Sequence, residues 1–370
     1  MTEIQTETSG KNYLYAVSYN EQHLAQIKQA AHSFYRARTF NDPHELLDLL
    51  HKKAPSALVV DGRLGGMSGA DFIAKVRTFL SGDMLPIVYT PSSTHIEAHD
   101  PSKDYPGVKV LEKPYRRTEL LHAISSQVNS SIESEWNDIE PVQQAALKNT
   151  LESFNSIADL MSEGNPVAYE DVTANCAPLL KAVQDQNYKE MLSGVRGHDN
   201  YSYVHSMRVA TLLSLFGSAI GIKGEDHMTL TAGGLLHDVG KMVIPHEVLN
   251  KAGKLDDKEF GVMKSHVTHT LEFLEKTQTL PKGVIIIAGE HHEKLDGTGY
   301  PFGLAGKELN QLARMATIID VFSALTDRRV YKPPMSPEKA LGIMGSMTGH
   351  LDQTLTLIFK EMLLDSVGDL

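Results

Sequence analysis

A set of histidine and aspartate residues in the C-terminal half of this chain has the composition of a metal site. Neutral imidazole nitrogens and carboxylate oxygens are the usual ligands of iron, manganese, nickel and zinc in proteins. Each of these residues lies in an amphipathic helical segment, and successive members are about one helix and one loop apart. Antiparallel helices of a bundle could therefore direct all of them to one point. The set consists of His205, His237, Asp238, His266, His291, His292 and Asp320.

Two ions are expected at this site, because five histidines and two aspartates exceed what one ion needs. Adjacent residues on a helix point about 100° apart, so His237 and Asp238 cannot aim at the same spot. A carboxylate between two ions can bridge them while each histidine binds one, and the doubled His291-His292 follows the same logic. The scattered histidines are expected to be ordinary surface or capped residues; they include His23, His32, His95 and His350.

A glycine-punctuated loop, DGTGYP, begins at Asp296, shortly after the second histidine pair. Gly297 and Gly299 permit backbone conformations and close approaches that other residues resist, and Pro301 fixes the backbone at the exit. We expect the loop, braced by Asp296, to hold Tyr300 over the site. There the phenol could donate a hydrogen bond to a phosphate or stack on a base. The alternative is a turn with a purely structural role.

These residues, taken in order, resemble the HD-GYP subclass of the HD metal-dependent phosphohydrolases. The likeness spans about residues 195–335 and rests on the metal-binding set, Lys241, the HHE and DGTGYP runs and the later DVFSALTDRRVYK. It implies an all-α HD-type helical bundle that hydrolyses a phosphodiester bond of a bacterial cyclic dinucleotide by attack of a metal-bridging hydroxide. The implied substrate is cyclic di-GMP, with linear pGpG or GMP as product. Iron or manganese are the expected ions, with nickel or zinc as alternatives.

The resemblance also implies roles for the residues around the metals. Lys241 and Asp238 are the expected catalytic residues, with Lys241 stabilising charge on the phosphate. A solvated surface lysine is the alternative for Lys241. Tyr201 stands where some family members carry a glutamate and hold a third ion, so two ions remain expected. Basic positions after the loop would bind a phosphate or a guanine edge. The expected substrate-binding residues are Gly299, Tyr300, Pro301, Arg314, Arg329 and Lys332.

The N-terminal part, residues 12–128, alternates short apolar runs with amphipathic stretches, which predicts an α/β domain with a doubly wound parallel sheet. Polar residues directly after the strands should gather at one edge of such a sheet, where phosphates and other ligands bind. Asp61 follows SALVV, Thr90 follows PIVY, and Lys113 ends VKVLEK. These three positions resemble the response-regulator receiver domain, in which an aspartate accepts phosphate and a Thr and a Lys contact it.

The acidic pair of receiver domains is missing from this chain. Receivers carry two acidic residues after the first strand to hold Mg²⁺, but here YLYAV is followed by Ser18-Tyr19-Asn20. Because Mg²⁺ prefers carboxylate ligands, their absence should weaken metal-assisted phosphoryl transfer. We therefore expect a degenerate receiver domain whose Asp61 takes part in no phosphoryl chemistry. Regulated phosphorylation of Asp61, as a phospho-acceptor, and binding of another ligand are the alternatives.

Residues 129–190 contain polar, helix-favouring sequence with apolar residues three and four apart, which predicts linker helices. Pro141 is expected near the start of one helix and Gly164-Asn165-Pro166 at its end. The linker would couple the outer domains or join two chains as a homodimer. The expected organisation is thus a receiver-like domain at 12–128, this helical linker, and an HD-GYP domain at 191–370.

Composition narrows the class of protein. The chain has 370 residues, more than one ordinary domain of about 100 to 200 residues. No apolar run approaches the roughly 20 residues of a membrane span, and the polar N-terminus lacks a secretory signal. The single cysteine, Cys176, argues against a disulfide framework and a thiolate metal site. We expect a cytoplasmic protein without membrane association and, at a net charge of −11, without nucleic-acid binding.

The leading hypothesis is a cyclic di-GMP phosphodiesterase that is regulated by its N-terminal domain, which could also bind other signalling proteins. The same chemistry on 3'3'-cyclic GMP-AMP is one alternative, because these motifs do not determine the contacts to base edges. A catalytically weak sensor of cyclic dinucleotides that binds partner proteins is the other. Loss of metal ligands would mark such a sensor, whereas all seven expected ligands are present here.

Overall fold

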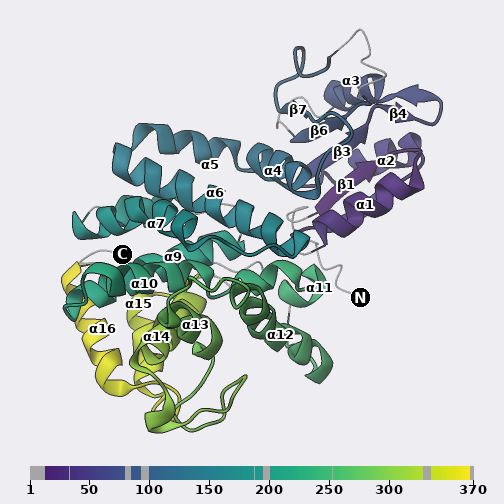
Figure 1. Ribbon diagram of the computed structural model, residues 1–370. Helices are drawn as coiled ribbons and strands as arrows, with labels where there is room; N and C mark the ends of the chain where they lie inside the picture. Colours follow the sequence, from purple (N-terminus) through teal and green to yellow (C-terminus); the bar gives the residue numbers. More distant parts are fainter. Residues whose placement is uncertain are drawn as a thin grey trace, which may run out of the picture. The chain divides into compact units, whose positions relative to one another are not determined.

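The chain folds into two compact units, Met1–Ser134 and Glu135–Leu370 (Figure 1). The computed structural model describes residues 13–32, 34–79, 85–92, 100–186, 188–194, 201–251, 253–327 and 335–366. Within these ranges no helix combines the length and the apolar content that a membrane span requires.

The first unit is built on a five-stranded sheet with the strand order β2-β1-β3-β6-β7, in which every neighbouring pair is parallel. This order reverses direction between β1 and β3, as in doubly wound α/β folds, and it confirms the predicted fold class. The strands are β1 Tyr13–Val17, β2 Arg36–Phe40, β3 Ala57–Asp61, β6 Ile87–Thr90 and β7 Val108–Val110. A short hairpin, β4 Arg63–Leu64 and β5 Met67–Ser68, follows β3.

Helices cover both faces of this sheet. Leu46 and Leu50 of α2 and Phe72 of α3 belong to one buried cluster, and Ile27 of α1 and Ile124 of α4 belong to the other. All residues of β3 are buried, as expected for a central strand with helices on both sides. The helices are α1 Glu21–Ala31, α2 Pro43–Leu50, α3 Gly69–Phe79, α4 Arg117–Val128 and α5 Ser130–Glu135.

Every helix or strand that the structure describes in the second unit is a helix, which confirms the prediction of a helical bundle. Its α-helices are α6 Pro141–Glu163, α7 Tyr169–Gln184, α8 Tyr188–Gly194, α9 Tyr201–Ala219, α10 Gly224–Leu236, α11 His246–Leu249, α12 Asp257–Leu274, α13 Lys282–Glu290, α14 Gln311–Thr326, α15 Pro337–Gly345 and α16 Gln353–Ser366. Short 3₁₀ turns connect some of them: η2 Trp136–Asp138, η3 Val239–Val243 and η4 Gly306–Glu308.

Local sequence explains several helix ends. A capping box begins α12, because the Asp256 side chain accepts from the Glu259 N–H while the Glu259 carboxylate accepts from the Asp256 N–H. Helix α6 begins with Pro141 at its first position, and it ends at Gly164, whose φ of 74° is left-handed. Both ends of α6 therefore lie where the sequence predicts them.

Helices α6 and α7 of the predicted linker belong to the second compact unit. In α9 the hydroxyl of Tyr203 donates to the carbonyl of Leu147 in α6 at 2.9 Å, and its ring packs edge-on against Phe154 at 5.9 Å between centroids. Tyr203 and Phe154 are both fully buried. Helix α6 therefore packs directly against α9 as part of the second unit.

Candidate metal centre

Close helix packing positions the seven histidine and aspartate residues. A Cβ on Gly234 of α10 would lie 2.6 Å from the Cα of Ala210 in α9, and one on Gly233 would lie 2.5 Å from Ile287 of α13. Because the neighbour of Gly234 is backbone, only glycine permits this approach of α10 to α9, whereas a larger residue at Gly233 would displace the end of the Ile287 side chain. The ends of α10 and α13 then carry His237 and His291, each at its C-cap position.

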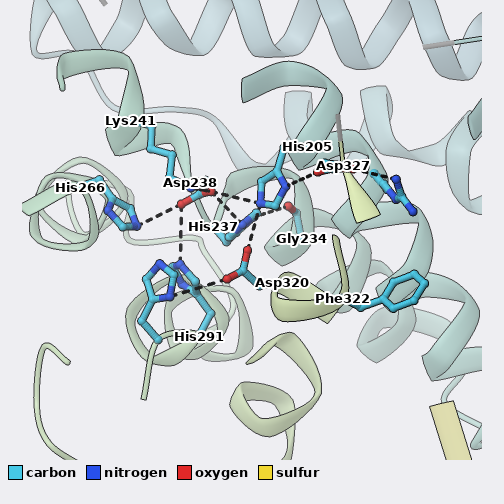
Figure 2. Close-up of polar contacts among 12 residues, drawn as sticks. His205, Gly234, His237, Asp238, Lys241, His266, His291, Asp320, Phe322 and Asp327 are labelled. Carbon is cyan, nitrogen blue, oxygen red and sulfur yellow. Dashed lines mark hydrogen bonds and ion pairs between the residues drawn. The ribbon is translucent and has the colours of Figure 1, made fainter. Parts of the chain in front are cut away.

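The seven residues converge in two groups that share Asp238 (Figure 2). Oδ1 of Asp238 lies 3.1 Å from Nε2 of His266 and 3.7 Å from Nε2 of His291. Its other oxygen, Oδ2, lies 3.2 Å from Nε2 of His237 and 3.4 Å from Nε2 of His205. The potential ligand atoms of each group are within 4.8 Å of one another. One group is Asp238, His266, His291 and His292; the other is His205, His237, Asp238 and Asp320.

Backbone carbonyls orient three of the imidazole rings. Nδ1 of His237 lies 2.8 Å from the carbonyl oxygen of Gly234, and Nδ1 of His266 lies 2.6 Å from that of Met263. Nδ1 of His291 lies 3.0 Å from the Ala288 carbonyl oxygen. Because a carbonyl can only accept, each Nδ1 must carry the proton. The lone pair of each Nε2 therefore faces the centre of the cluster, which is the tautomer that binds a metal.

Four buried atoms at this centre have no hydrogen-bond partner among the described residues. They are Nε2 of His237, His266 and His291 and Oδ1 of Asp238. A buried polar atom without a partner is costly and rare in folded proteins. Four of them, all acceptors converging on one point, fit a site built for cations, and the mixture of imidazole and carboxylate suits transition metals.

Burial and neighbouring charges give five of the seven residues the protonation states that metal ligands need. Burial lowers the pKa values of His237, His266 and His292, which keeps these rings neutral. Burial would raise the pKa of Asp238, but Lys241 and His237 hold it well below its usual range. Asp320 is likewise buried, and hydrogen bonding to His205 holds its pKa well below the usual range. Neutral imidazole and ionised carboxylate are the forms that bind metal ions.

Asp327, which the sequence analysis missed, orients His205. Its Oδ2 lies 3.0 Å from Nδ1 of His205, and its Oδ1 accepts from Nη1 of Arg208 at 2.7 Å. Burial would lower the pKa of His205, but hydrogen bonds to Asp320 and Asp327 raise it to about 9. Asp327 lies two helical turns after Asp320 and therefore on the same side of α14. This spacing is the signal that could have revealed it in the sequence.

Lys241 reaches the shared carboxylate. It lies in η3, and its ammonium donates to Oδ2 of Asp238 from a side chain that is 15% exposed. It is therefore not a solvated surface lysine.

The DGTGYP loop brings Tyr300 next to His292 of the cluster. Gly297 has a φ of 75°, and a Cβ on Gly299 would lie 2.4 Å from the Cα of Glu293, so both positions require glycine. Asp296 accepts from the backbone N–H and the hydroxyl of Thr298 at 2.9 and 2.6 Å. The Tyr300 ring lies 4.8 Å from that of His292 between centroids. Burial and the charges of Asp320 and Asp238 raise the pKa of Tyr300, which keeps its phenol protonated.

Glu293 is the second residue that the sequence analysis missed. Its carboxylate is buried and accepts three backbone N–H groups of the segment after Pro301. Oε1 accepts from Phe302 at 2.6 Å and Gly303 at 3.0 Å, and Oε2 accepts from Leu304 at 3.1 Å. Glu293 therefore ties the outgoing end of the loop to the residues that follow His292.

The other predicted substrate-binding residues are only partly described. Arg314 donates from Nη1 to Oδ2 of Asp352 at 2.9 Å, so this guanidinium is engaged by a carboxylate at the start of α16. Arg329 and Lys332 lie outside the described residues, as does the side chain of Tyr201.

The first unit gathers its own charged cluster around Asp61. Lys113 donates to Oδ1 of Asp61 at 2.6 Å, whereas the hydroxyl of Ser18 at 2.5 Å and Nδ1 of His23 at 2.9 Å donate to Oδ2. Asp61 and Thr90 are register partners at the ends of β3 and β6, as predicted for one sheet edge. Burial would raise the pKa of Asp61, but these three donors lower it.

The expectation of an ordinary surface or capped histidine is wrong for His23. This residue is 6% exposed, and its Nε2 lies 2.5 Å from the hydroxyl of Tyr115. It lies in the first turn of α1, which starts beside the end of β1, and the parallel pairing of β1 with β3 brings that point next to Asp61. A histidine and a serine thus stand beside Asp61, close to where receiver domains carry the acidic pair.

Residues 191–355 match the family model of the HD domain. The chain is 38% identical over 175 residues to cyclic di-GMP phosphodiesterase PA4108 of Pseudomonas aeruginosa, covering 46% of this chain and 42% of that protein. It is 40% identical over 144 residues to 3'3'-cGAMP-specific phosphodiesterase 3 of Vibrio cholerae, covering 39% of this chain and 31% of that protein. The chain thus spans less than half the length of these two relatives.

Two further similarities extend over more of the chain. Cyclic di-GMP phosphodiesterase response regulator RpfG of Xanthomonas campestris pv. campestris is 28% identical over 317 residues, which cover 84% of this chain and 76% of that protein. The solved structure of Bd1817, an HDG"Y"P protein from Bdellovibrio bacteriovorus, matches with a TM-score of 0.49 at 20% identity, covering 67% of this chain and 81% of that chain.

Proposed function

We propose that residues 191–355, which match the family model of the HD domain, hydrolyse a phosphodiester bond of a bacterial cyclic dinucleotide, with cyclic di-GMP as the first candidate. The observation that carries the proposal is the pair of ligand groups that share Asp238, with unpartnered acceptor atoms directed into them. The names of the similar proteins support the substrate class, because they include phosphodiesterases of cyclic di-GMP and of 3'3'-cGAMP.

Two divalent transition-metal ions would be held by the two groups, with Asp238 contributing one oxygen to each. Iron or manganese are the first candidates, and nickel or zinc the alternatives, because each accepts imidazole and carboxylate ligands. When bound, such a pair activates water for attack and neutralises charge on the phosphate.

The most exposed of the seven residues indicate where the substrate enters. The His292 side chain is 22% exposed and that of Asp320 is 10% exposed, whereas the side chains of Asp238 and His266 are 1% exposed. The Tyr300 ring packs beside that of His292 at an interplanar angle of 31°, so the phenol lies at the mouth of the site. A substrate phosphate would therefore arrive between His292 and Asp320, below the Tyr300 ring.

Lys241 and Tyr300 would act on that phosphate in different ways. The Lys241 ammonium lies next to the shared carboxylate, where it can stabilise negative charge that grows in the transition state. Tyr300 keeps its proton, so it can donate a hydrogen bond to a phosphate oxygen and orient it. Asp327 acts through His205 and would hold that ring in register with Asp320.

A second candidate substrate is 3'3'-cyclic GMP-AMP. The observation that favours it is the 40% identity over 144 residues with a 3'3'-cGAMP-specific phosphodiesterase, which is close to the 38% over 175 residues shared with a cyclic di-GMP phosphodiesterase. The two dinucleotides differ only at a base, so contacts outside the metal groups would decide between them.

The first unit is proposed to regulate this activity and to bind other signalling proteins. Asp61 is engaged by Lys113, His23 and Ser18, so such regulation would use binding rather than phosphoryl transfer. Helices α6 and α7 are proposed to join two chains as a homodimer.

The test is turnover of both dinucleotides by the purified full chain after reconstitution with Fe²⁺, Mn²⁺, Ni²⁺ or Zn²⁺. Linear or mononucleotide product from cyclic di-GMP, lost in Asp238→Asn, is the expected result. Faster turnover of 3'3'-cyclic GMP-AMP would select the second candidate. Tight binding without turnover in any metal form would refute the enzyme and indicate a sensor.

A further inference from the structure

A row of aromatic rings leads outward from the metal-binding cluster. His266 and His292 are 5.1 Å apart between ring centroids, and His292 and Tyr300 are 4.8 Å apart. Beyond Tyr300, at 6.3 Å and nearly perpendicular to it, lies the ring of Phe260. The row therefore runs from buried imidazoles to a phenylalanine that is 46% exposed.

The ammonium of Lys264 lies beside the outer two rings of this row, and we call Phe260, Lys264 and Tyr300 the rim of the site. Nζ of Lys264 lies 5.1 Å from the centroid of the Phe260 ring and 5.8 Å from that of Tyr300. Phe260 and Lys264 are four residues apart on α12, so they lie on one face of the helix. Helix α12 also carries His266, so Phe260 and Lys264 are held at a fixed position relative to the cluster.

An exposed aromatic ring and an ammonium at this place suit one kind of ligand. A flat ring offers a surface on which a nucleobase can stack, and an ammonium attracts a phosphate. A cyclic dinucleotide carries two bases and two phosphates, so a phosphate between His292 and Asp320 leaves one nucleotide that extends past Tyr300. Phe260 and Lys264 are the next groups in that direction.

We propose that Phe260 and Lys264 bind the nucleotide that follows the reacting phosphate, with Phe260 stacking on its base and Lys264 pairing with its phosphate. This inference rests on the proposed function, because it assigns part of the same substrate to the rim. Phe260 and Lys264 are substrate-positioning residues in this scheme, and their effect falls on binding rather than on bond cleavage.

Steady-state kinetics of the metal-loaded full chain test the assignment. Phe260→Ala should raise KM for cyclic di-GMP by roughly 10-fold, the scale of one lost base stack, with kcat changed about twofold or less. Lys264→Met should also raise KM and should weaken the dependence of KM on salt, because one ionic contact is gone. Phe260→Trp and Lys264→Arg should restore the wild-type KM.

Matched controls remove the same kinds of side chain elsewhere in the second unit. Leu357→Ala removes a side chain that is 55% exposed on α16, and Lys258→Met removes an exposed lysine near the start of α12. Both should keep the wild-type KM. Equal KM in wild type and Phe260→Ala, or an equal rise in Phe260→Ala and Leu357→Ala, would overturn the inference.

A fluorescence measurement separates this inference from the proposed function. Trp136 is the single tryptophan of the chain and is 2% exposed, so Phe260→Trp adds one new reporter at the rim. GMP should quench that reporter by stacking, whereas ribose 5-phosphate, which has no base, should not. Absence of quenching by GMP, or equal quenching by GMP and ribose 5-phosphate, would refute the stacking of a base at position 260 even if the enzyme is active. Quenching without hydrolysis of either dinucleotide would refute the proposed reaction and retain the binding site.

Discussion

Glu293→Gln is expected to release the loop that carries Tyr300 while leaving the metal ligands in place. The substitution keeps the shape of the side chain and one carbonyl oxygen, which can still accept from Phe302 and Gly303. The new amide nitrogen is a donor, and it would face the backbone N–H of Leu304, where the carboxylate now accepts at 3.1 Å. One charge-assisted hydrogen bond is lost, and the other two become neutral.

The magnitude follows from these three contacts. Hydrogen bonds to charged groups contribute about 1.5–3 kcal/mol each, and neutral ones about 1 kcal/mol. Loss of one bond therefore costs the held conformation of the loop at least about 2 kcal/mol. This is a factor of roughly 30 in the equilibrium between held and released loop. If the held loop is the major state in the wild type, the fraction of molecules with a held loop falls by less than the equilibrium constant does. We therefore expect kcat/KM to fall by about 5- to 30-fold.

Hydrogen exchange at Phe302, Gly303 and Leu304 should accelerate in parallel, and metal content should stay at the wild-type value. Glu290→Gln is the matched control, because Glu290 lies at the end of α13 and, in the described part of the chain, makes no hydrogen bond with these three residues, and Gln keeps an oxygen that can accept from the backbone of Asn310. It should leave kcat/KM and exchange unchanged. The reasoning is refuted if Glu293→Gln keeps kcat/KM within about twofold with unchanged exchange, or if it loses its metals.

The two ligand groups predict two metal ions per chain, so mass spectrometry should find one ion fewer in His237→Ala and both lost in Asp238→Ala; full retention in either variant contradicts the site. Lys241→Ala should lower kcat by about 10²-fold or more, whereas Tyr300→Phe should mainly raise KM with both metals retained, because an ammonium responds to developing charge and a phenol orients what is bound. Full kcat in the first variant, or no turnover at saturating substrate in the second, would reject this division. Small-molecule phosphodonors with Mg²⁺ should fail to label Asp61, since protein donors engage both of its oxygens; stoichiometric labelling by intact mass would indicate an ordinary receiver. The folded pKa of Asp61 is lowered, so its contacts stabilise the first unit above about pH 4 and lose that effect as the pH falls below it. The difference in Tm between wild type and Asp61→Asn should therefore shrink below pH 4, and a constant difference down to pH 3 would argue against this.

Much of the fold could be predicted from residue patterns. Apolar runs such as SALVV must be buried on both sides, so the alternation of runs and amphipathic stretches indicates a parallel sheet with helices on both faces. The polar residues after those runs, Asp61 and Thr90, meet at one edge because parallel strands end together. That α6 and α7 belong to the second compact unit could not be predicted in this way. An amphipathic helix shows that it has an apolar face, but not which partner covers that face.

The seven residues of the candidate metal centre could be named from the sequence because their chemistry is unusual. Histidine and aspartate inside apolar helical segments are costly to bury, so their presence there demands a compensating function. The sequence indicated that a carboxylate could lie between two ions, but it did not identify Asp238 as the shared one. Its place depends on how closely α10 approaches α9 and α13, and this depends on Gly233 and Gly234.

Residues that act through partners far along the chain were decided only by the tertiary structure. His23 and Asp61 are separated by 38 positions and His205 and Asp327 by 122, and although the spacing from Asp320 could have drawn attention to Asp327, no local pattern shows that either pair is in contact. Residue type and spacing report what a side chain can do and which face of its element it occupies. They do not report which distant side chain will lie 3 Å away, because that distance is the joint result of packing whole helices and strands against one another. The sequence by itself therefore determined the chemistry available to this protein, and the tertiary contacts decided which groups orient it.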